Sequence, residues 1–152
     1  MGWQSRSFLN PTQTVIAVNV GGCLIPLLIA LYEVTFVLGD GYALRSLAVV
    51  VVANILVCYF AARPVPRFGI TMPAWISPLV AVAASWLMLS SPDYETVRAP
   101  VAFVGGVMGP LVGADLLHLK DISRISTGML SIGGAGKYDG IVLSGIMAAL
   151  FA

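Results

Sequence analysis

Two aspartates occupy positions in which a carboxylate can do chemistry. Asp115 lies within the apolar stretch LVGADLLHL, and Asp139 follows the glycine-rich stretch GGAGKY. Two carboxylates held close together in a medium of low dielectric cannot both ionise easily, so such a pair can share one proton. A shared proton allows one carboxylate to activate water for attack on an amide while its protonated partner polarises the carbonyl. The same pair could relay protons or bind a cation.

Each aspartate also has a purely structural interpretation. Asp139 precedes Gly140 and an apolar run, which is the position from which an aspartate caps a helix by accepting a backbone N–H. Asp115 could accept a hydrogen bond from a neighbouring backbone group or from His118, about one helical turn further along. A histidine at such a position is more often a satisfied interfacial residue than a ligand.

The composition excludes an ordinary soluble domain. Of the 152 residues, 59% are hydrophobic and 10% are charged, whereas a soluble domain carries about 25% charged residues. The net charge is +1 and the chain has no basic tract, so a nucleic-acid partner is not expected. Cys23 and Cys58 both lie in apolar runs, and the sequence has no zinc-ligand spacing. We therefore expect no disulfide, metal or cofactor.

The apolar runs predict the fold. A membrane-spanning helix needs about 20 apolar residues, and four runs qualify. These runs cover residues 15–38, 42–62, 73–91 and 99–119, and a fifth, shorter run covers 140–152. We therefore predict an all-α, polytopic membrane protein with about five segments in a single domain over residues 1–152, the last segment short or broken at the glycine-rich turn.

Charges in the loops predict the orientation. If all five segments cross, one side carries Arg6, Arg63, Arg67, Lys120, Arg124 and Lys137, and the other carries Arg45 and Arg98. Because cytoplasmic loops are enriched in Lys and Arg, the amino terminus and the GGAGKYDG loop are expected in the cytoplasm.

Helix lengths predict that the two aspartates lie at one depth. The last run, as a helix, spans about 20 Å of a hydrocarbon core about 30 Å thick, which puts Asp139 about 10 Å below the cytoplasmic boundary. Counting inward from Pro100, Asp115 lies about 8 Å from the same boundary. Ionisable groups at one depth in an apolar bundle indicate a functional site.

Two further patterns concern packing. Gly105, Gly109 and Gly113 recur at every fourth residue and predict a helix face that another backbone approaches closely, in a homo-oligomer or within the chain. At 100° per residue Asp115 would point away from this face. Glu33 and Arg45 lie at similar distances from the LGDG turn and predict a structural ion pair.

The chain resembles a known family. The stretches NVGGCLIPLL, VGGVMGPLVGADLLHLKDI and SIGGAGKYDGIVLSGIMA are similar to those of the domain-of-unknown-function sixteen-fourteen family of small prokaryotic membrane proteins. This resemblance implies a location in a prokaryotic cytoplasmic membrane and brings no settled activity.

A weaker resemblance is to the GxGD intramembrane aspartyl proteases, the presenilin, signal-peptide-peptidase and prepilin-peptidase group. The stretch VGAD, ending at Asp115, is similar to the GxGD motif, and Tyr138 with Asp139 is similar to the Tyr-Asp pair of presenilin. Ala114 replaces the glycine before the aspartate, and the two motifs occur in the reverse order.

These patterns together lead to one functional hypothesis with two alternatives. The hypothesis is a small intramembrane aspartyl protease-like enzyme that acts on transmembrane helical substrates among membrane lipids. Asp115 and Asp139 would be catalytic, with auxiliary roles for His118, Tyr138, Gly113 and Gly136. The first alternative is a homo-oligomeric proton- or cation-coupled transporter or channel that uses the same carboxylates, and the second is a non-catalytic membrane scaffold.

Overall fold

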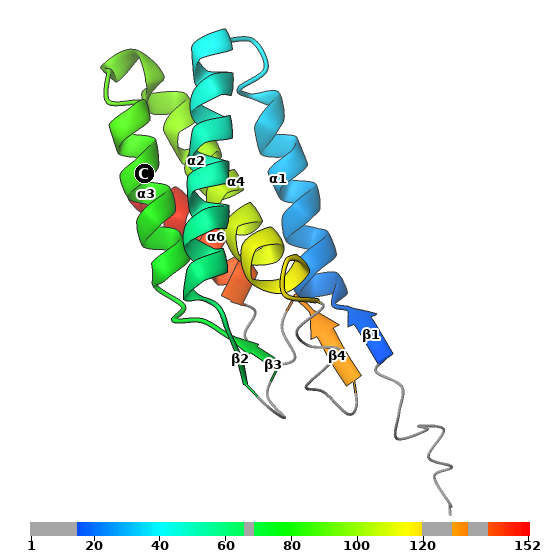
Figure 1. The fold of residues 1–152 in the computed structure, drawn as a ribbon. Coiled ribbons are helices and arrows are strands. Elements are labelled where there is room, and N and C mark those ends of the chain that lie inside the picture. Colours follow the sequence, from blue (N-terminus) through cyan, green and yellow to red (C-terminus); the bar gives the residue numbers. More distant parts are fainter. Residues whose placement is uncertain (1–14, 66–68, 120–128, 134–139) are drawn as a thin grey trace, which may run out of the picture.

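The protein is mostly helical, as predicted. The computed structural model describes the chain except for residues 1–14, 66–68, 120–128 and 134–139 (Figure 1). The helices are the π-helix η1 (Val20–Leu24), α1 (Ile25–Thr35), α2 (Gly41–Ala61), α3 (Ile76–Met88), the 3-10 helix η2 (Pro92–Tyr94), α4 (Glu95–Met108), the π-helix η3 (Gly109–Leu116) and α6 (Gly140–Phe151). The strands are β1 (Val15–Val18), β2 (Arg63–Val65), β3 (Gly69–Thr71) and β4 (Met129–Ile132).

Successive long helices run in opposite directions along one bundle. In Figure 1, α1 rises from β1, α2 descends to the β2–β3 hairpin, α3 rises, and α4 with η3 descends again. All four strands lie at one end of the bundle, and the turns at 36–40 and 89–94 lie at the other. This alternation agrees with the order of apolar runs in the sequence.

Two helices are long and apolar enough to cross a membrane. They are Gly41–Ala61, which is α2, and the continuous helical stretch Pro92–Leu116. Three more apolar helices are shorter, at Val20–Thr35, Ile76–Met88 and Gly140–Phe151. By length and composition, two of the five predicted membrane segments therefore qualify as spans, and the membrane placement of the other three stays a prediction.

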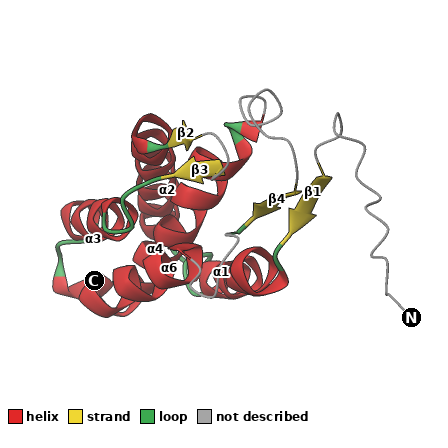
Figure 2. Cartoon of the chain, turned by 90° about the horizontal axis from the view of Figure 1, so that it is seen from below, coloured by secondary structure: helices red, strands yellow, loops and turns green. Residues whose placement is uncertain are grey.

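Helix α4 is the centre of the bundle. It contacts α1, α2, α3 and α6, and the view along the bundle shows these helices gathered around it (Figure 2). Each residue from 101 to 107 is buried, and Val101, Ala102 and Val107 are completely so. A helix that is apolar all round is expected in a core of this kind, because no face of it needs water.

Glycines let α2 approach the central helix closely. A Cβ atom added at Gly105 would lie 2.7 Å from Cγ1 of Val50, and one at Gly109 would lie 2.5 Å from Nδ2 of Asn54. Gly113 faces α2 in the same way, against the backbone of Ile55. The predicted glycine face is thus used inside the chain, so this row of glycines gives no support to the predicted homo-oligomer.

A buried polar network joins four helices where α4 passes into η3. Pro110 has no backbone N–H, so the carbonyl of Gly106, four residues earlier, loses its usual helical donor. The hydroxyl oxygens of Ser144 and Ser77 instead lie 2.7 Å and 3.2 Å from this carbonyl oxygen. Asn54 donates through Nδ2 to Gly105 O at 2.8 Å and to Ser77 Oγ at 3.0 Å. Buried polar groups are stable only when bonded in this way.

Large apolar side chains cover the surface of the bundle, and several polar side chains are buried inside it. Phe60 and Leu87 are 79% and 80% exposed, whereas Asn54, Ser77 and Ser85 have no exposed surface. Further large apolar side chains are exposed along the same helices, including Leu28, Leu31, Val52, Leu79 and Leu150. A helical bundle in water shows the opposite distribution, with polar residues outside.

The first helix starts later than the sequence predicts. Residues 15–18 form β1, which pairs in parallel with β4 from Val15 opposite Met129 to Val18 opposite Ile132. Helical structure therefore begins at Val20 and not at Val15. The β-branched residues of VIAV fit a strand as well as they fit an apolar helix.

The predicted ion pair between Glu33 and Arg45 is wrong. Both side chains are described, and no ion pair joins them; Arg45 is exposed to the surroundings of the bundle. The two residues do not meet because α1 and α2 each pack against α4 and make little contact with one another.

The close approach of α2 leads to a test of the packing. We expect Gly109→Ala to lower the free energy of unfolding by about 1–3 kcal/mol, since the new methyl group would displace Asn54 from its partners. Gly41→Ala is the matched control, because nothing lies within 4 Å of a Cβ atom at that glycine. Denaturant unfolding in detergent, followed by circular dichroism, measures both variants. Equal stability of the two would contradict this account of the α2–α4 contact.

Candidate functional site: the Asn19–Gly133–Asp115 junction

Three distant segments meet at the strand end of the bundle. Asn19 lies between β1 and η1, Asp115 lies in η3, and Gly133 directly follows β4. Hydrogen bonds connect the three residues, and we call this group the junction. It contains the one predicted catalytic residue that the structure describes.

The π-helix η3 sets the position of Asp115. The helix changes from α to π at Gly109, next to Pro110, so the angle of 100° per residue used for the sequence prediction does not apply beyond that point. Asp115 is partly buried, and its Oδ2 accepts a hydrogen bond from the backbone N–H of Gly133 at 3.0 Å. Asp115 therefore makes a hydrogen bond to a backbone group, as its structural interpretation predicted.

Gly133 occupies a place that suits no other residue. Its φ is +88°, in the left-handed region, and the residue is buried. A Cβ atom here would lie 2.8 Å from both the backbone N of Cys23 and the carbonyl carbon of Gly22. The backbone directly after β4 therefore packs in close contact with the backbone of η1.

Asn19 holds the other side of Gly133. Its Oδ1 accepts from the N–H groups of Gly21 at 3.0 Å and Gly22 at 3.3 Å, which caps η1. Its Nδ2 donates to the carbonyl of Gly133 at 3.3 Å, and its backbone N–H donates to Ile132 O at 2.9 Å. Asp115 and Asn19 therefore bind the N–H and the C=O of the same residue.

Asn19 and Gly133 were missed as site residues by the sequence reasoning. For Asn19 a signal existed, because an asparagine directly before a helical run is a helix N-cap pattern. Nothing in the sequence shows that the side chain of this cap would also reach Gly133, 114 positions away.

His118 lies just after η3, and its ring contacts carbonyl groups of that helix. It is 7% exposed, and its Nδ1 lies 3.1 Å from the carbonyl oxygens of both Gly113 and Ala114. Carbonyl oxygens only accept, so Nδ1 must carry the hydrogen. The ring also packs on Tyr59, with 4.7 Å between the ring centroids. These contacts satisfy the histidine structurally, and its auxiliary role stays a prediction.

The remaining predicted site residues divide into two groups. Gly113 belongs to the close contact with α2 described above. Asp139, Tyr138 and Gly136 lie outside the described residues, so the predicted Asp115–Asp139 pair stays a prediction. Helix α6, which begins one residue after Asp139, contacts η3 and η1.

The described part of the chain offers no metal centre. No group of three or more His, Cys, Asp or Glu side chains within it could hold a metal ion. Within the described residues, neither Cys23 nor Cys58 forms a disulfide.

Comparison with known proteins decides the family. Residues 4–151 match a family model described as "Protein of unknown function (DUF1614)". The chain belongs to the DUF1614 family. Searches against curated proteins and against solved structures return no match. The resemblance drawn from the sequence is thus confirmed for DUF1614, whereas the resemblance to the GxGD proteases gains no support from these comparisons.

The three stretches that carry the DUF1614 resemblance meet at the junction. NVGGCLIPLL supplies Asn19, VGGVMGPLVGADLLHLKDI supplies Asp115, and SIGGAGKYDGIVLSGIMA supplies Gly133.

Substitution of Asp115 separates its two properties, acceptor and charge. Asp115→Ala leaves the N–H of Gly133 without this acceptor and should lower the free energy of unfolding by about 1–3 kcal/mol. Asp115→Asn keeps an acceptor oxygen and should stay within about 1 kcal/mol of the wild type. Unfolding in detergent checks both values. Asp93→Ala, an exposed carboxylate at the other end of the bundle, is the control and should change stability by less than about 0.5 kcal/mol.

Proposed function

We propose that this chain is an integral membrane protein in which all five helical segments enter or cross the bilayer. The exposed apolar side chains and the polar side chains buried within the core support this proposal, because lipid, unlike water, favours that distribution. Helix α2, at 21 residues, has a length of about 31 Å, close to the hydrocarbon thickness of about 30 Å. The excess of Lys and Arg favours a cytoplasmic strand end.

Cysteine labelling tests this topology. In a Cys23→Ala, Cys58→Ala background, Asp93→Cys should react with a membrane-impermeant maleimide in intact bacterial cells. Thr71→Cys, at the strand end, should react only after the cells are opened. The reverse result would overturn the orientation, and reaction of both in intact cells would overturn the bilayer placement.

Within the membrane, we propose that Asp115 acts with Asp139 as the aspartate pair of a protease-like hydrolase. The observation that carries this proposal is the fixed Asp115 carboxylate at the point where η1, η3 and β4 meet. The contact of α6 with η3 supports the pairing, since α6 directly follows Asp139.

In this mechanism the ionised aspartate removes a proton from water as the water oxygen attacks the peptide carbonyl carbon. The protonated aspartate donates a hydrogen bond to the carbonyl oxygen, and a proton then passes to the leaving amine. His118, Tyr138, Gly113 and Gly136 would shape the surroundings of the pair.

The β1–β4 strand pair favours a peptide substrate. In the described chain each of these strands has one neighbour, so each has an edge with open backbone groups. An extended peptide can add to such an edge through main-chain hydrogen bonds. A peptide bond must leave its helical hydrogen bonding to be attacked, and pairing with a strand edge next to Asp115 would stabilise the extended form.

A proton- or cation-coupled transporter is the second candidate. It is favoured by the interruption of two helices at the same end, where η1 and η3 are π-helical. Transporters use discontinuous helices to supply backbone ligands near a charged side chain, and π-helical turns often occur at functional sites. Asp115 would then bind the proton or cation. A scaffold would need Asp115 only for structural contacts such as its bond to Gly133.

Reconstitution with reporter helices tests the enzyme. Wild-type protein in liposomes should cleave members of a panel of single-span reporter peptides that carry a fluorophore and a quencher on opposite sides. Asp115→Asn and Asp139→Asn should each lower the cleavage rate about 100-fold or more, because each removes a group that transfers a proton. Asp93→Asn should leave the rate unchanged.

The outcomes separate the candidates. Full cleavage by Asp115→Asn would end the dyad mechanism. Absence of cleavage by the wild type, together with a proton flux into the liposomes that Asp115→Asn abolishes, would favour the transporter. Absence of both activities would favour the scaffold.

A further inference from the structure

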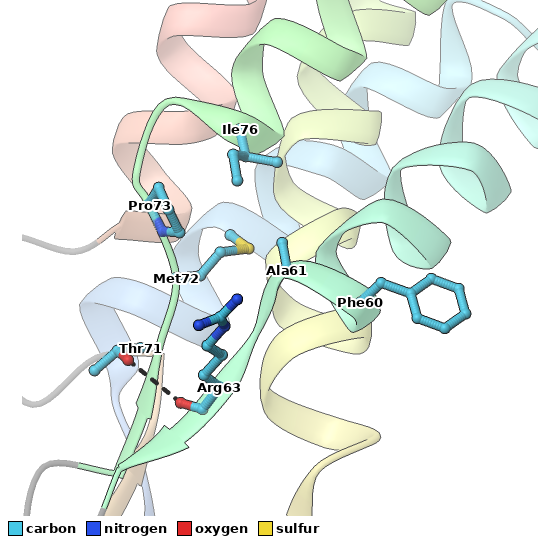
Figure 3. A pocket seen from close by; sticks show the side chains of 7 residues that line it. All are labelled: Phe60, Ala61, Arg63, Thr71, Met72, Pro73 and Ile76. Carbon is cyan, nitrogen blue, oxygen red and sulfur yellow. Dashed lines mark hydrogen bonds between the residues drawn. The ribbon is translucent and has the colours of Figure 1, made fainter.

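A pocket opens beside the junction end of the bundle, between the end of α2 and the start of α3. Its volume is about 470 Å³. Polar groups come from Arg63 and Thr71, and apolar walls come from Met72, Pro73 and Ile76, whereas the ring of Phe60 points away from these residues (Figure 3). None of these residues takes part in the Asn19–Gly133–Asp115 junction.

Local sequence builds this pocket. Helix α2 ends at Ala61, and the chain turns into the β2–β3 hairpin, in which Arg63 pairs with Thr71. The hydroxyl of Thr71 donates to the carbonyl of Arg63 at 3.3 Å, which fixes the base of the hairpin. Pro73 then leads the chain back to α3, so the hairpin connects the end of α2 to the start of α3.

The side chain of Arg63 lines this pocket, and the residue is exposed. Figure 3 shows its guanidinium directed away from the hairpin, toward Met72. In the described part of the chain, no carboxylate or carbonyl binds this guanidinium, although it carries five N–H donors. A guanidinium with open donors binds phosphate well, because its planar fork matches two phosphate oxygens.

The apolar walls distinguish the ligand class. Phe60 is 79% exposed on the outer surface of α2, and Arg63 follows α2 by two residues. If α2 spans the hydrocarbon core, Arg63 lies at the level of the phospholipid head groups and Phe60 lies at the first carbons of the acyl chains. A free phosphate would contact the cation alone, whereas a phospholipid would also contact the apolar walls formed by Met72 and Ile76.

We propose that this pocket binds an anionic phospholipid, with the lipid phosphate on Arg63 and its glycerol and first acyl carbons along Met72 and Ile76. This inference rests on the membrane placement proposed above and is independent of the chemistry of Asp115. It gives the chain a lipid site at the same end as the junction.

Native mass spectrometry with phosphatidylglycerol tests the site. The wild type in detergent should retain phosphatidylglycerol, and Arg63→Gln should weaken this binding about 5-fold, as expected for one cation at a membrane surface. Arg63→Lys should recover part of the binding. Arg45→Gln, which removes an exposed arginine at the opposite end of α2, is the matched control and should bind as the wild type does.

Three results would overturn the proposal. The first is equal retention of phosphatidylglycerol by Arg63→Gln and the wild type. The second is an equal loss in Arg45→Gln, which would indicate unspecific attraction of charge. The third is displacement of the lipid by an equal concentration of sn-glycerol 3-phosphate, which would indicate a site for free phosphate esters. Asp115→Asn should bind the lipid normally, so failure of the aspartate mechanism and failure of this site are separate results.

Discussion

The missing backbone N–H of Pro110 is the constraint on which much of this bundle depends. It leaves the carbonyl of Gly106 without its helical donor in the most buried part of the molecule. Ser77 and Ser144 donate to that carbonyl, and Asn54 joins the same network. Four helices are thereby tied together at one level by hydrogen bonds whose partners have no contact with the surroundings.

The same proline stands at the start of the π-helix η3. A π-turn is wider than an α-turn, so the residues that follow Gly109 are rotated relative to an ideal helix. This rotation sets where Asp115 meets Gly133 and where the carbonyls of Gly113 and Ala114 meet His118. The core network and the junction are therefore consequences of one interruption in one helix.

The junction places two polar side chains on one glycine from opposite sides. Because Asp115 binds the N–H of Gly133 and Asn19 binds its C=O, the chain after β4 is held at both backbone polar groups of a single residue. The positive φ of Gly133 removes any side chain from this position and allows its contact with η1. Such an arrangement is rigid, which suits a site that must hold a carboxylate in a constant position.

Some of this structure follows from the sequence by itself. The apolar runs determined the helical class and the approximate helix positions, because the periodic or continuous burial of apolar residues is a local property. The spacing of Gly105, Gly109 and Gly113 determined a close helix contact, and three stretches of sequence determined the family. Asp115 stood out because a carboxylate in an apolar run is costly without a partner.

Other features were decided only by the tertiary structure. The pairing of Val15–Val18 with Met129–Ile132, the reach of Asn19 to Gly133, and the meeting of α2 and α3 around Arg63 all join residues that are separated along the chain. Local propensity cannot predict such contacts, since they depend on how the helices pack against α4. The glycine row shows the same division: its spacing predicted a partner helix, and only the packing of the whole bundle identified that partner as α2.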